Sequence, residues 1–327
     1  MVRLLVVGVG SMGWNHCRVC SELGILAGVS DPDHELMEKV SSHFGVPGFI
    51  DIEEALDQTT PDGVIVASPT STHFSIAERV LEAGINVLVE KPLVSELIHG
   101  ERLVSLSEEN ELILAVGHIE RHNPVISRAR THLKQGDWGE LITMNSRRVS
   151  AFSGRIMDVG AILDTGIHDI DNLIYLMDSN PVSVYATGGK INDIDHEDHA
   201  NIVINFENGK SGVVEVNWIT PMKVRTLSLT CDGCYVELDY IGQKIIISRS
   251  SSSDMESPRL FPPPIEFKST KINLNKEEPL RLEIEDFISS IKSRSPPLVD
   301  GKQALISLRT ALAAVESLNS GEVVKIE

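Results

Sequence analysis

The stretch from Leu4 to Gly13, Leu-Leu-Val-Val-Gly-Val-Gly-Ser-Met-Gly, limits the possible fold more than any other part of the chain. An apolar run typical of a buried strand leads into Gly-x-Gly-x-x-Gly, and a helical pattern of apolar residues follows. Glycines in such a turn let backbone amides approach a pyrophosphate, and the start of the next helix favours its negative charge. The motif also occurs in purely structural turns, but the order strand, turn and helix predicts a dinucleotide-binding unit.

A second apolar run, residues 25–30, ends at Asp31. This acid lies roughly 20 positions after the first glycine, the usual interval to the carboxylate that binds the adenosine ribose. It would accept bonds from the ribose hydroxyls and repel a 2′-phosphate, so NAD is expected in preference to NADP; the alternative is an acid that only caps the next helix. The cofactor-binding residues predicted in this region are Gly8, Gly10, Ser11, Met12, Gly13 and Asp31.

Strands and helices continue to alternate up to residue 118. Strands are expected over 63–69, 86–89 and 112–118, and helices over 33–44, 70–83 and 95–109. This alternation predicts a doubly wound parallel sheet of the α/β class, and we assign residues 1–119 to it. Ser68 and Thr70 lie where a strand ends at the same sheet edge as the glycine turn, so both are expected at the cofactor. His73 is expected either near the nicotinamide ribose or as a capping or surface histidine.

The pattern changes after residue 118. Strand-like segments joined by turns now dominate, over 141–149, 182–188, 199–206, 212–218, 226–230, 234–239 and 244–248. Residues 248–264 are rich in serine and proline and are expected to form an excursion between strands. We therefore assign residues 120–327 to a second, α+β domain with a large, mostly antiparallel sheet.

Composition narrows the possible partners. The chain has 327 residues, too many for one ordinary compact domain, and its 42% hydrophobic content is that of a globular protein. Its net charge of −18 argues against nucleic acid and anionic membranes, which require a basic surface. No apolar run is long enough to span a membrane, and the amino terminus leaves no room for a signal peptide before the first strand. We expect a cytoplasmic protein that binds neither nucleic acid nor membrane.

The four cysteines form two Cys-x-x-Cys pairs, Cys17/Cys20 and Cys231/Cys234. The pairs lie far apart in the sequence, and the first falls within an expected helix, whereas zinc knuckles sit on tight turns. The second pair, Cys-Asp-Gly-Cys, is typical of a hairpin turn, where a small disulfide is the alternative to free thiols. Because a cytoplasmic chain is normally reduced, we expect ordinary thiols and no metal site.

Residues 86–92, Asn-Val-Leu-Val-Glu-Lys-Pro, place two charges and a proline at the end of an apolar strand. In open α/β sheets, ligands bind beyond the carboxyl ends of the strands. Glu90 and Lys91 are therefore expected beside the cofactor, with Lys91 directed at a substrate. A solvated ion pair at the strand end is the alternative. Proline ends the strand, and an X-Pro bond at this point can be cis.

A third motif, Asp164-Thr-Gly-Ile-His168-Asp-Ile-Asp171, begins a helix with an apolar stripe. Asp164 and His168 are predicted to share one helix face. A carboxylate in that position holds the tautomer of an imidazole and raises its basicity, as a general base requires. A helix cap beside a packed histidine is the alternative. With a dinucleotide site and Lys91, the pair completes the groups needed for hydride transfer between an alcohol and a ketone.

These motifs occur in the order and spacing of the Gfo/Idh/MocA oxidoreductase family, which the whole chain resembles. The resemblance implies a Rossmann domain, a C-terminal α/β domain, and dimers or tetramers packed through the open face of the second sheet. It also implies NAD(P)-linked oxidation of a secondary alcohol of a sugar or cyclitol. In this scheme Lys91 positions and polarises the reacting oxygen, His168 takes its proton and Asp164 orients the site.

Within the family, the chain is most similar to the UDP-N-acetylglucosamine 3-dehydrogenase branch, although His122 and Thr165-Gly166 depart from it. The similarity lies in Gly117-His-Ile-Glu-Arg121-His-Asn123-Pro, Arg147-Arg148-Val and Asp158-Val-Gly-x-x-x-Asp164. A nucleotide sugar needs cations for its pyrophosphate, which the arginines can supply, unless they are ordinary surface charges. The predicted substrate-binding residues are Lys91, Arg121, Asn123, Arg148, Arg155, Asp164 and His168.

The favoured hypothesis is an NAD-dependent enzyme that oxidises UDP-N-acetylglucosamine at C3 and forms a homodimer or homotetramer. A free-sugar or inositol dehydrogenase of the same family is the enzymatic alternative. A regulator that senses NAD without catalysis is the third hypothesis. Such a regulator does not need Lys91, Asp164 and His168, so their presence favours an enzyme.

Overall fold

The computed structural model describes residues 2–152, 159–192, 195–251 and 266–326. The chain divides into two compact units, Met1–His122 with Glu278–Arg309 and Asn123–Glu277 with Thr310–Glu327. The first boundary lies close to the predicted division between residues 119 and 120. The assignment of residues 120–327 to one domain does not include the return of Glu278–Arg309 to the first unit, because the sequence of a segment does not show which core its apolar residues join.

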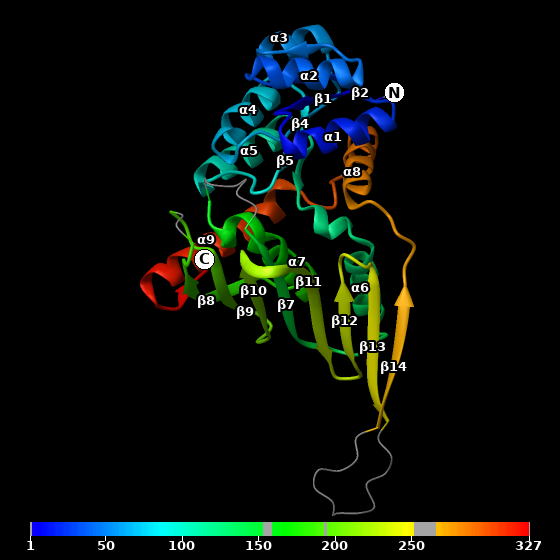
Figure 1. Ribbon diagram of the computed structural model, residues 1–327, viewed down its shortest axis with the longest axis vertical. Coiled ribbons are helices and arrows are strands. Elements are labelled where there is room, and N and C mark those ends of the chain that lie inside the picture. Colours follow the sequence, from blue (N-terminus) through cyan, green and yellow to red (C-terminus); the bar gives the residue numbers. More distant parts are fainter. Residues whose placement is uncertain (1, 153–158, 193–194, 252–265, 327) are drawn as a thin grey trace, which may run out of the picture. The chain divides into compact units, whose positions relative to one another are not determined.

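The first unit contains the parallel sheet that the strand–helix alternation predicts (Figure 1). Its described residues form six parallel strands in the order β3-β2-β1-β4-β5-β6. The strands are β1 Leu4–Val7, β2 Leu26–Ser30, β3 Gly48–Phe49, β4 Gly63–Val66, β5 Asn86–Glu90 and β6 Leu114–Gly117. The strand order reverses between β1 and β4, which makes their carboxyl ends the expected ligand-binding edge. The predicted doubly wound fold is confirmed.

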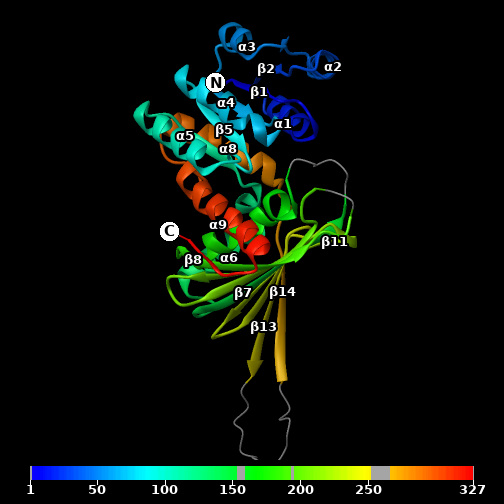
Figure 2. The ribbon, with the colours of Figure 1, turned by 90° about the vertical axis from the view of Figure 1, so that its left-hand side faces the viewer.

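Helices pack on both faces of this sheet (Figure 1, Figure 2). They are α1 Ser11–Glu22, α2 His34–Phe44, α3 Ile52–Thr59, α4 Thr70–Glu82, α5 Leu97–Glu109 and α8 Pro279–Ser293, with the 3-10 turn η1 at Ile119–His122. Helices α1, α2 and α8 share one apolar core that includes Cys17, Val40 and Phe287. Asp33 and Asp51 start α2 and α3 by accepting bonds from the first free amides.

The described part of the second unit is built on one nine-stranded sheet, in the order β14-β13-β12-β11-β7-β10-β9-β8-β15. Every neighbouring pair is antiparallel except β7 and β10. The strands are β7 Leu141–Ala151, β8 Pro181–Gly189, β9 His199–Phe206, β10 Ser211–Asn217, β11 Ile219–Cys231, β12 Tyr235–Asp239, β13 Lys244–Ser251, β14 Glu266–Asn273 and β15 Val324–Lys325. The predicted mostly antiparallel sheet is confirmed. Most of the predicted 248–264 excursion lies outside the described residues.

Helices of the second unit lie on one face of the large sheet (Figure 2). They are α6 Pro124–Gln135, the π-helical turn η2 Ile162–Gly166, α7 Ile167–Met177 and the end of α9 Gly301–Ser320. Side chains alternate along each strand, so the opposite face carries the exposed positions of β8 and the partly exposed ones of β9 and β10. Tyr185, Val203 and Val213 pair across these strands and form an apolar row on that face.

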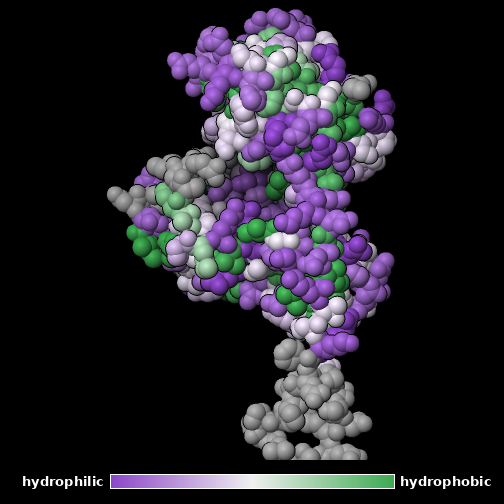
Figure 3. All heavy atoms as spheres, turned by 45° about the vertical axis from the view of Figure 1, so that its right-hand side comes forward, coloured by the Kyte–Doolittle hydropathy of each residue, from purple (hydrophilic) through white to green (hydrophobic). Residues whose placement is uncertain are grey.

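The molecular face drawn in Figure 3 is mostly hydrophilic, with small hydrophobic areas among the charged side chains. Scattered apolar side chains of this kind are ordinary for a folded protein. Of the helices that the structure describes, none is long and apolar enough to cross a membrane.

Candidate functional site

The glycine turn between β1 and α1 combines two tight contacts with one open position. Gly8 has a φ of +83°, a left-handed conformation that glycine adopts without strain. A Cβ on Gly8 would lie 2.5 Å from the backbone nitrogen of Ser68, and a Cβ on Gly13 would lie 1.9 Å from the carbonyl oxygen of Gly8. A Cβ on Gly10 would instead meet nothing within 4 Å. Two glycines thus serve close packing, whereas Gly10 leaves space beside the start of α1.

The start of α1 has the properties of an anion site. No side chain caps this helix, and its first turn contains no acidic residue. Gly10, Ser11 and Met12 are exposed, so the first amides of the helix are accessible. Backbone amides at a helix start bind phosphate groups well. The turn therefore fits the pyrophosphate of a dinucleotide.

Asp31 lies beside this turn at the end of β2. Its carboxylate accepts a bond from the Val9 amide over 2.8 Å and another from the Asp33 amide over 2.9 Å. A carboxylate has about four acceptor positions, so two remain for ribose hydroxyls. The carboxylate is thus held in place by the backbone of the glycine turn, which fits its predicted role at the adenosine ribose.

Replacing Asp31 with asparagine is expected to shift the NADP-to-NAD preference toward NADP by about tenfold or more, because one buried charge beside a 2′-phosphate is removed. Asparagine keeps an oxygen for the Val9 amide. Dissociation constants for both cofactors, measured by calorimetry, give the ratio. Asp57→Asn, an equal charge change at an exposed position of α3, should leave it unaltered. An unchanged ratio in Asp31→Asn would remove Asp31 from the cofactor site.

Glu90, the last residue of β5, is a buried carboxylate with defined partners. His16 Nε2 donates to Glu90 Oε1 over 2.8 Å, and the Lys91 amide donates to Oε2 over 3.2 Å. Gly117 on β6 makes room for this carboxylate, since a Cβ there would lie 3.0 Å from Oε2. Burial raises the pKa of Glu90, but the bond from His16 and the charges of His16, Lys91 and His73 bring it below its ordinary value. Glu90 is therefore ionised at neutral pH.

His16 has a contact that the sequence pattern does not predict. Its side chain is fully buried on α1, and its partner is the carboxylate next to Lys91. The signal in the sequence was a histidine three residues after the last glycine of the turn, which places it on the helix face that meets the sheet. The apolar residues around it made it resemble an ordinary core position.

His73 links two backbone segments at this edge of the sheet. It is 1% exposed, and its ring nitrogens lie 2.9 Å from the carbonyl oxygens of Pro92 and Ser68. Burial lowers the pKa of His73, opposed by its bonds to these two carbonyls. Because both nitrogens are occupied within the unit, the geometry favours a positioning role over the predicted contact with the cofactor. Ser68 accepts a bond from Thr72, and Thr70 begins α4 beside it.

In the second unit, Asp164 and His168 are half-buried and lie on consecutive turns. The expected regular helix is interrupted here, because Asp164 is in the π-helical turn η2 and His168 in α7. Single π turns are wider than α turns and are frequent at functional sites. The Thr165 hydroxyl donates to Asp164 Oδ2 over 2.8 Å, and the Trp218 indole donates to Thr165 Oγ1 over 2.9 Å. This chain of bonds orients Asp164, and nothing in the sequence pattern predicts the part that Thr165 and Trp218 have in it.

Arg148, predicted to bind substrate, has an internal partner. Its guanidinium pairs with Asp169, and both side chains are nearly fully buried. Asp169 also accepts from the Ser146 hydroxyl over 2.6 Å, and the Arg148 guanidinium lies 5.4 Å from the centre of the Tyr240 ring. Separating a buried ion pair leaves an uncompensated charge and costs about 3–5 kcal/mol. These contacts favour a structural role for Arg148.

Two further predicted substrate residues, Arg121 and Asn123, also have structural contacts. Arg121 is 3% exposed and donates to Gln303 within the first unit. Asn123 is the N-cap of α6 and accepts from the Val125 amide over 3.3 Å. Arg155 lies outside the described residues. Contact of these three with a substrate stays a prediction.

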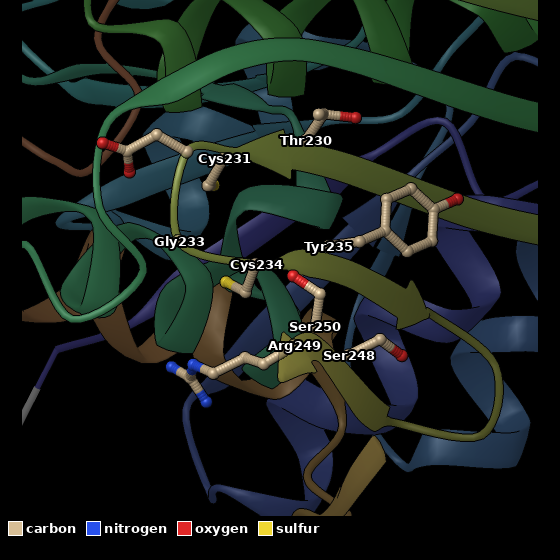
Figure 4. A pocket seen from close by; sticks show the side chains of 9 residues that line it. Thr230, Cys231, Gly233, Cys234, Tyr235, Ser248, Arg249 and Ser250 are labelled. Carbon is tan, nitrogen blue, oxygen red and sulfur yellow. The ribbon is translucent and has the colours of Figure 1, made fainter. Parts of the chain in front are cut away.

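A shallow pocket of about 310 Å³ lies at the turn between β11 and β12 (Figure 4). It is lined by Thr230, Cys231, Asp232, Gly233, Cys234, Tyr235, Ser248, Arg249 and Ser250. Both cysteines are free and buried, and burial raises the pKa of Cys231 to about 12. Burial also raises the pKa of Cys234, against the charge of Arg249. The thiols are therefore protonated at neutral pH, and none of the predicted site residues lines this pocket.

Comparisons with known proteins identify a family whose models match both parts of the chain. Residues 2–118 match the GFO_IDH_MocA model, described as an oxidoreductase family with an NAD-binding Rossmann fold, and residues 126–236 match the GFO/IDH/MocA C-terminal domain. The UDP-N-acetylglucosamine 3-dehydrogenase of Acidithiobacillus ferrooxidans is 28% identical over 96% of this chain and 95% of its own length. The scyllo-inositol 2-dehydrogenase (NAD(+)) of Bacillus subtilis is 26% identical over 100% of this chain and 96% of its own.

A solved structure of the A. ferrooxidans enzyme has the same fold. It superposes with a TM-score of 0.87 at 27% identity and covers 97% of each chain. The matched Rossmann model is described as NAD-binding, so NAD is the cofactor, and the geometry of the glycine turn and of the Asp31 carboxylate fits it. The chain belongs to the Gfo/Idh/MocA family and is an NAD-dependent oxidoreductase.

Proposed function

We propose that this oxidoreductase oxidises a secondary alcohol of a sugar, and that UDP-N-acetylglucosamine, oxidised at C3, is its favoured substrate. The observation that carries the proposal is the position of Lys91, directly after the ionised Glu90 carboxylate at the carboxyl edge of the NAD-binding sheet. The similarity to a UDP-N-acetylglucosamine 3-dehydrogenase over 96% of the chain supports the choice of substrate. Arg121 and Arg148 do not support the choice of substrate, because both have partners within the protein.

Oxidation of an alcohol to a ketone releases a hydride and a proton. The glycine turn and Asp31 would hold NAD, which would supply the hydride acceptor. The Lys91 ammonium donates to the reacting oxygen and stabilises the negative charge that develops on it. His168 accepts the hydroxyl proton as general base, and Asp164 orients the reacting groups. The bonds from Thr165 and Trp218 keep the Asp164 carboxylate in one orientation.

Replacing Thr165 with valine is expected to lower kcat by about tenfold, because a hydrogen bond to a charged group contributes roughly 1.5–3 kcal/mol and Asp164 loses one. Valine has nearly the shape of threonine, so substrate binding should change little. Thr165→Ser keeps the hydroxyl and serves as the matched control, with near wild-type kcat. Steady-state kinetics on the best substrate distinguish the two. Equal kcat values for the valine and serine variants would mean that the Trp218–Thr165–Asp164 chain does not serve catalysis.

The substrate is tested by incubating the protein with UDP-N-acetylglucosamine and NAD. NADH absorbance, or a keto-sugar detected by mass spectrometry, is the expected result. A parallel reaction contains 2-oxoglutarate, which reoxidises NADH if the cofactor stays bound after turnover. Absence of both products in both reactions would exclude this substrate.

A free-sugar or inositol dehydrogenase is the second candidate, supported by the similarity to scyllo-inositol 2-dehydrogenase over the whole chain. A panel of inositols, free hexoses and UDP-sugars, compared by kcat/KM, separates the two candidates. The NAD-sensing regulator is the third. Protein that binds NAD but turns over no member of the panel would favour it.

We also propose a homodimer or homotetramer that packs through the open face of the nine-stranded sheet. The apolar row of Tyr185, Val203 and Val213 supports this interface, since no described helix covers that face. The first domain, residues 1–119, would bind the cofactor and the second, residues 120–327, the substrate and the partner subunit. A cytoplasmic location is consistent with reduced cysteines.

A further inference from the structure

Glu283 on α8 is a buried carboxyl group that the proposed mechanism does not use. It is 3% exposed, and neither of its oxygens has a hydrogen-bond partner among the described residues. The adjacent Ile284 and, one turn on, Phe287 belong to the core that α8 shares with α1 and the sheet. A buried carboxylate without a partner is costly enough that the group takes up a proton instead. The position of this acid in an apolar core therefore needs a physical reason.

Glu283 lies close to His16 and Glu90, the bonded pair at the end of β5. One ligand atom each from His16, Glu90 and Glu283 lies within 4.8 Å of the other two. His16 Nε2 is bonded to Glu90, whereas His16 Nδ1 has no partner among the described residues. The Glu283 carboxyl group thus lies next to an ionised carboxylate and an imidazole, both of which can accept a proton in a hydrogen bond.

Charge balance decides the ionisation of this cluster. The surrounding elements carry charged or titratable groups that include His16 on α1, Glu90 and Lys91 at the end of β5, Asp286 on α8, and Glu120, Arg121 and His122 on η1. Burial first, and then the charges of Glu90 and Asp286, raise the pKa of Glu283 well above its ordinary value. With Glu283 neutral, the single charge of Glu90 is balanced by the neighbouring Lys91.

We propose that Glu283 is a positioning residue, buried as a neutral carboxylic acid whose proton is directed at the Glu90–His16 pair, and that it thereby holds the Glu90 carboxylate beside Lys91. Its effect on turnover rests on the proposed function, but its protonation does not. A metal ion bound by His16, Glu90 and Glu283 is the competing explanation of the same geometry, because one imidazole and two carboxylates are possible zinc ligands.

Infrared spectroscopy tests the protonation without any substrate. Wild-type protein at neutral pH is expected to show a carboxylic-acid C=O stretch that is absent from Glu283→Gln. The matched control is Glu285→Gln, which removes an exposed acid from the same helix and should keep the band. A wild-type spectrum without this band, or with one that persists in Glu283→Gln, would overturn the proposal.

Unfolding equilibria supply a second test that is independent of substrate. Because the folded state holds the Glu283 proton to a higher pH than the unfolded chain does, the contribution of this group to stability is full below its ordinary pKa of 4.5 and is lost as the pH rises toward the folded pKa. In this window, the unfolding constant of wild type divided by that of Glu283→Gln should rise by up to about tenfold per pH unit. The corresponding ratio for Glu285→Gln should show no such rise. If the ratio of the wild-type unfolding constant to that of Glu283→Gln does not change with pH, Glu283 is not a buried neutral acid.

Kinetics test the positioning role. Glutamine keeps the shape of the neutral acid and a donor, so Glu283→Gln should retain kcat within about twofold, whereas Glu283→Leu should lower it about tenfold. The leucine variant should also shift the pH profile of kcat/KM, because the charge state of Glu90 beside Lys91 changes; a purely structural residue would leave the profile unchanged. Rescue by glutamine but not leucine supports the proposal, and equal loss in both variants overturns it.

Metal analysis distinguishes the neutral acid from the competing explanation, a metal ion bound by His16, Glu90 and Glu283. Purified wild-type protein is expected to contain no stoichiometric zinc, and a chelator should not alter its infrared band or unfolding midpoint. About one equivalent of zinc that is lost in Glu283→Gln would replace the proposal with a metal site. If no sugar is turned over by the wild type, the infrared and unfolding results still decide the protonation of Glu283, so failure of the proposed function is distinguishable from failure of this inference.

Discussion

Replacing Lys91 with methionine is expected to lower kcat by about 10³-fold while NAD still binds. Methionine keeps the length and the apolar stem of the side chain but removes the ammonium that stabilises the developing oxyanion. Glu90 should stay in place, because its bonds come from His16 and from the backbone amide of residue 91. Steady-state kinetics with the best sugar give kcat, and calorimetry gives the dissociation constant of NAD.

Lys39→Met is the matched control, since Lys39 is exposed on α2 and the same charge is removed. Its kcat and NAD affinity should equal those of the wild type. Undiminished turnover in Lys91→Met would refute the catalytic role. Loss of NAD affinity comparable to the loss of kcat would instead make Lys91 mainly a cofactor contact, which was the other role predicted for it.

Replacing His168 with asparagine is expected to lower kcat/KM by about 10²–10⁴-fold, the usual contribution of a general base. Wild-type activity should fall at low pH, where an imidazolium can no longer accept the hydroxyl proton. That acid limb should disappear in the variant, whose residual rate rises with hydroxide concentration. The pH profile of kcat/KM, measured at the same NAD concentration for the wild type and the variant, distinguishes a lost base from a misfolded site.

His132→Asn provides the control for this substitution. His132 lies on α6 and its Nδ1 is 2.6 Å from Asp137, so it has a partner of its own in the second unit. Its removal should leave both the rate and the acid limb intact.

The Lys91→Met/His168→Asn double variant should be scarcely slower than the slower of the two single variants, because the effects of groups that act on one step are strongly non-additive. Additive losses would indicate that the two residues serve separate steps.

The geometry of the candidate cofactor site was predictable because its signals in the sequence are local. Gly8, Gly10 and Gly13 follow one strand and open one helix. Glycine adopts the positive φ of Gly8 without strain, and the 1.9 Å approach at Gly13 leaves no room for a Cβ. Asp31 follows the next strand at the interval that ribose binding requires. The parallel sheet followed from strand–helix alternation, since parallel strands need crossover connections.

The contacts that hold the candidate site residues in place were not predictable in the same way. The bond between His16 and Glu90 joins α1 to β5, and the bond between Trp218 and Thr165 joins η2 to the residue between β10 and β11. Arg148 on β7 pairs with Asp169 on α7. Each contact depends on how separate elements pack, and spacing within one element carries no information about it. The short strands β3 and β15 and the helix α3 were missed for a related reason: segments of this length have too few residues for a periodic signal.

The sequence by itself determined the fold class, the family and NAD as cofactor, because short motifs encode a glycine turn, a strand-end acid and the Glu90-Lys91-Pro92 strand end. Only the tertiary structure decided which polar side chains are committed to one another. It paired Arg148 with a buried carboxylate, placed both nitrogens of His73 against carbonyl oxygens and brought Glu283 from the end of the chain to within 4.8 Å of Glu90. The physical reason is that burial and charge depend on neighbours in space, and these are fixed when distant segments pack into one core.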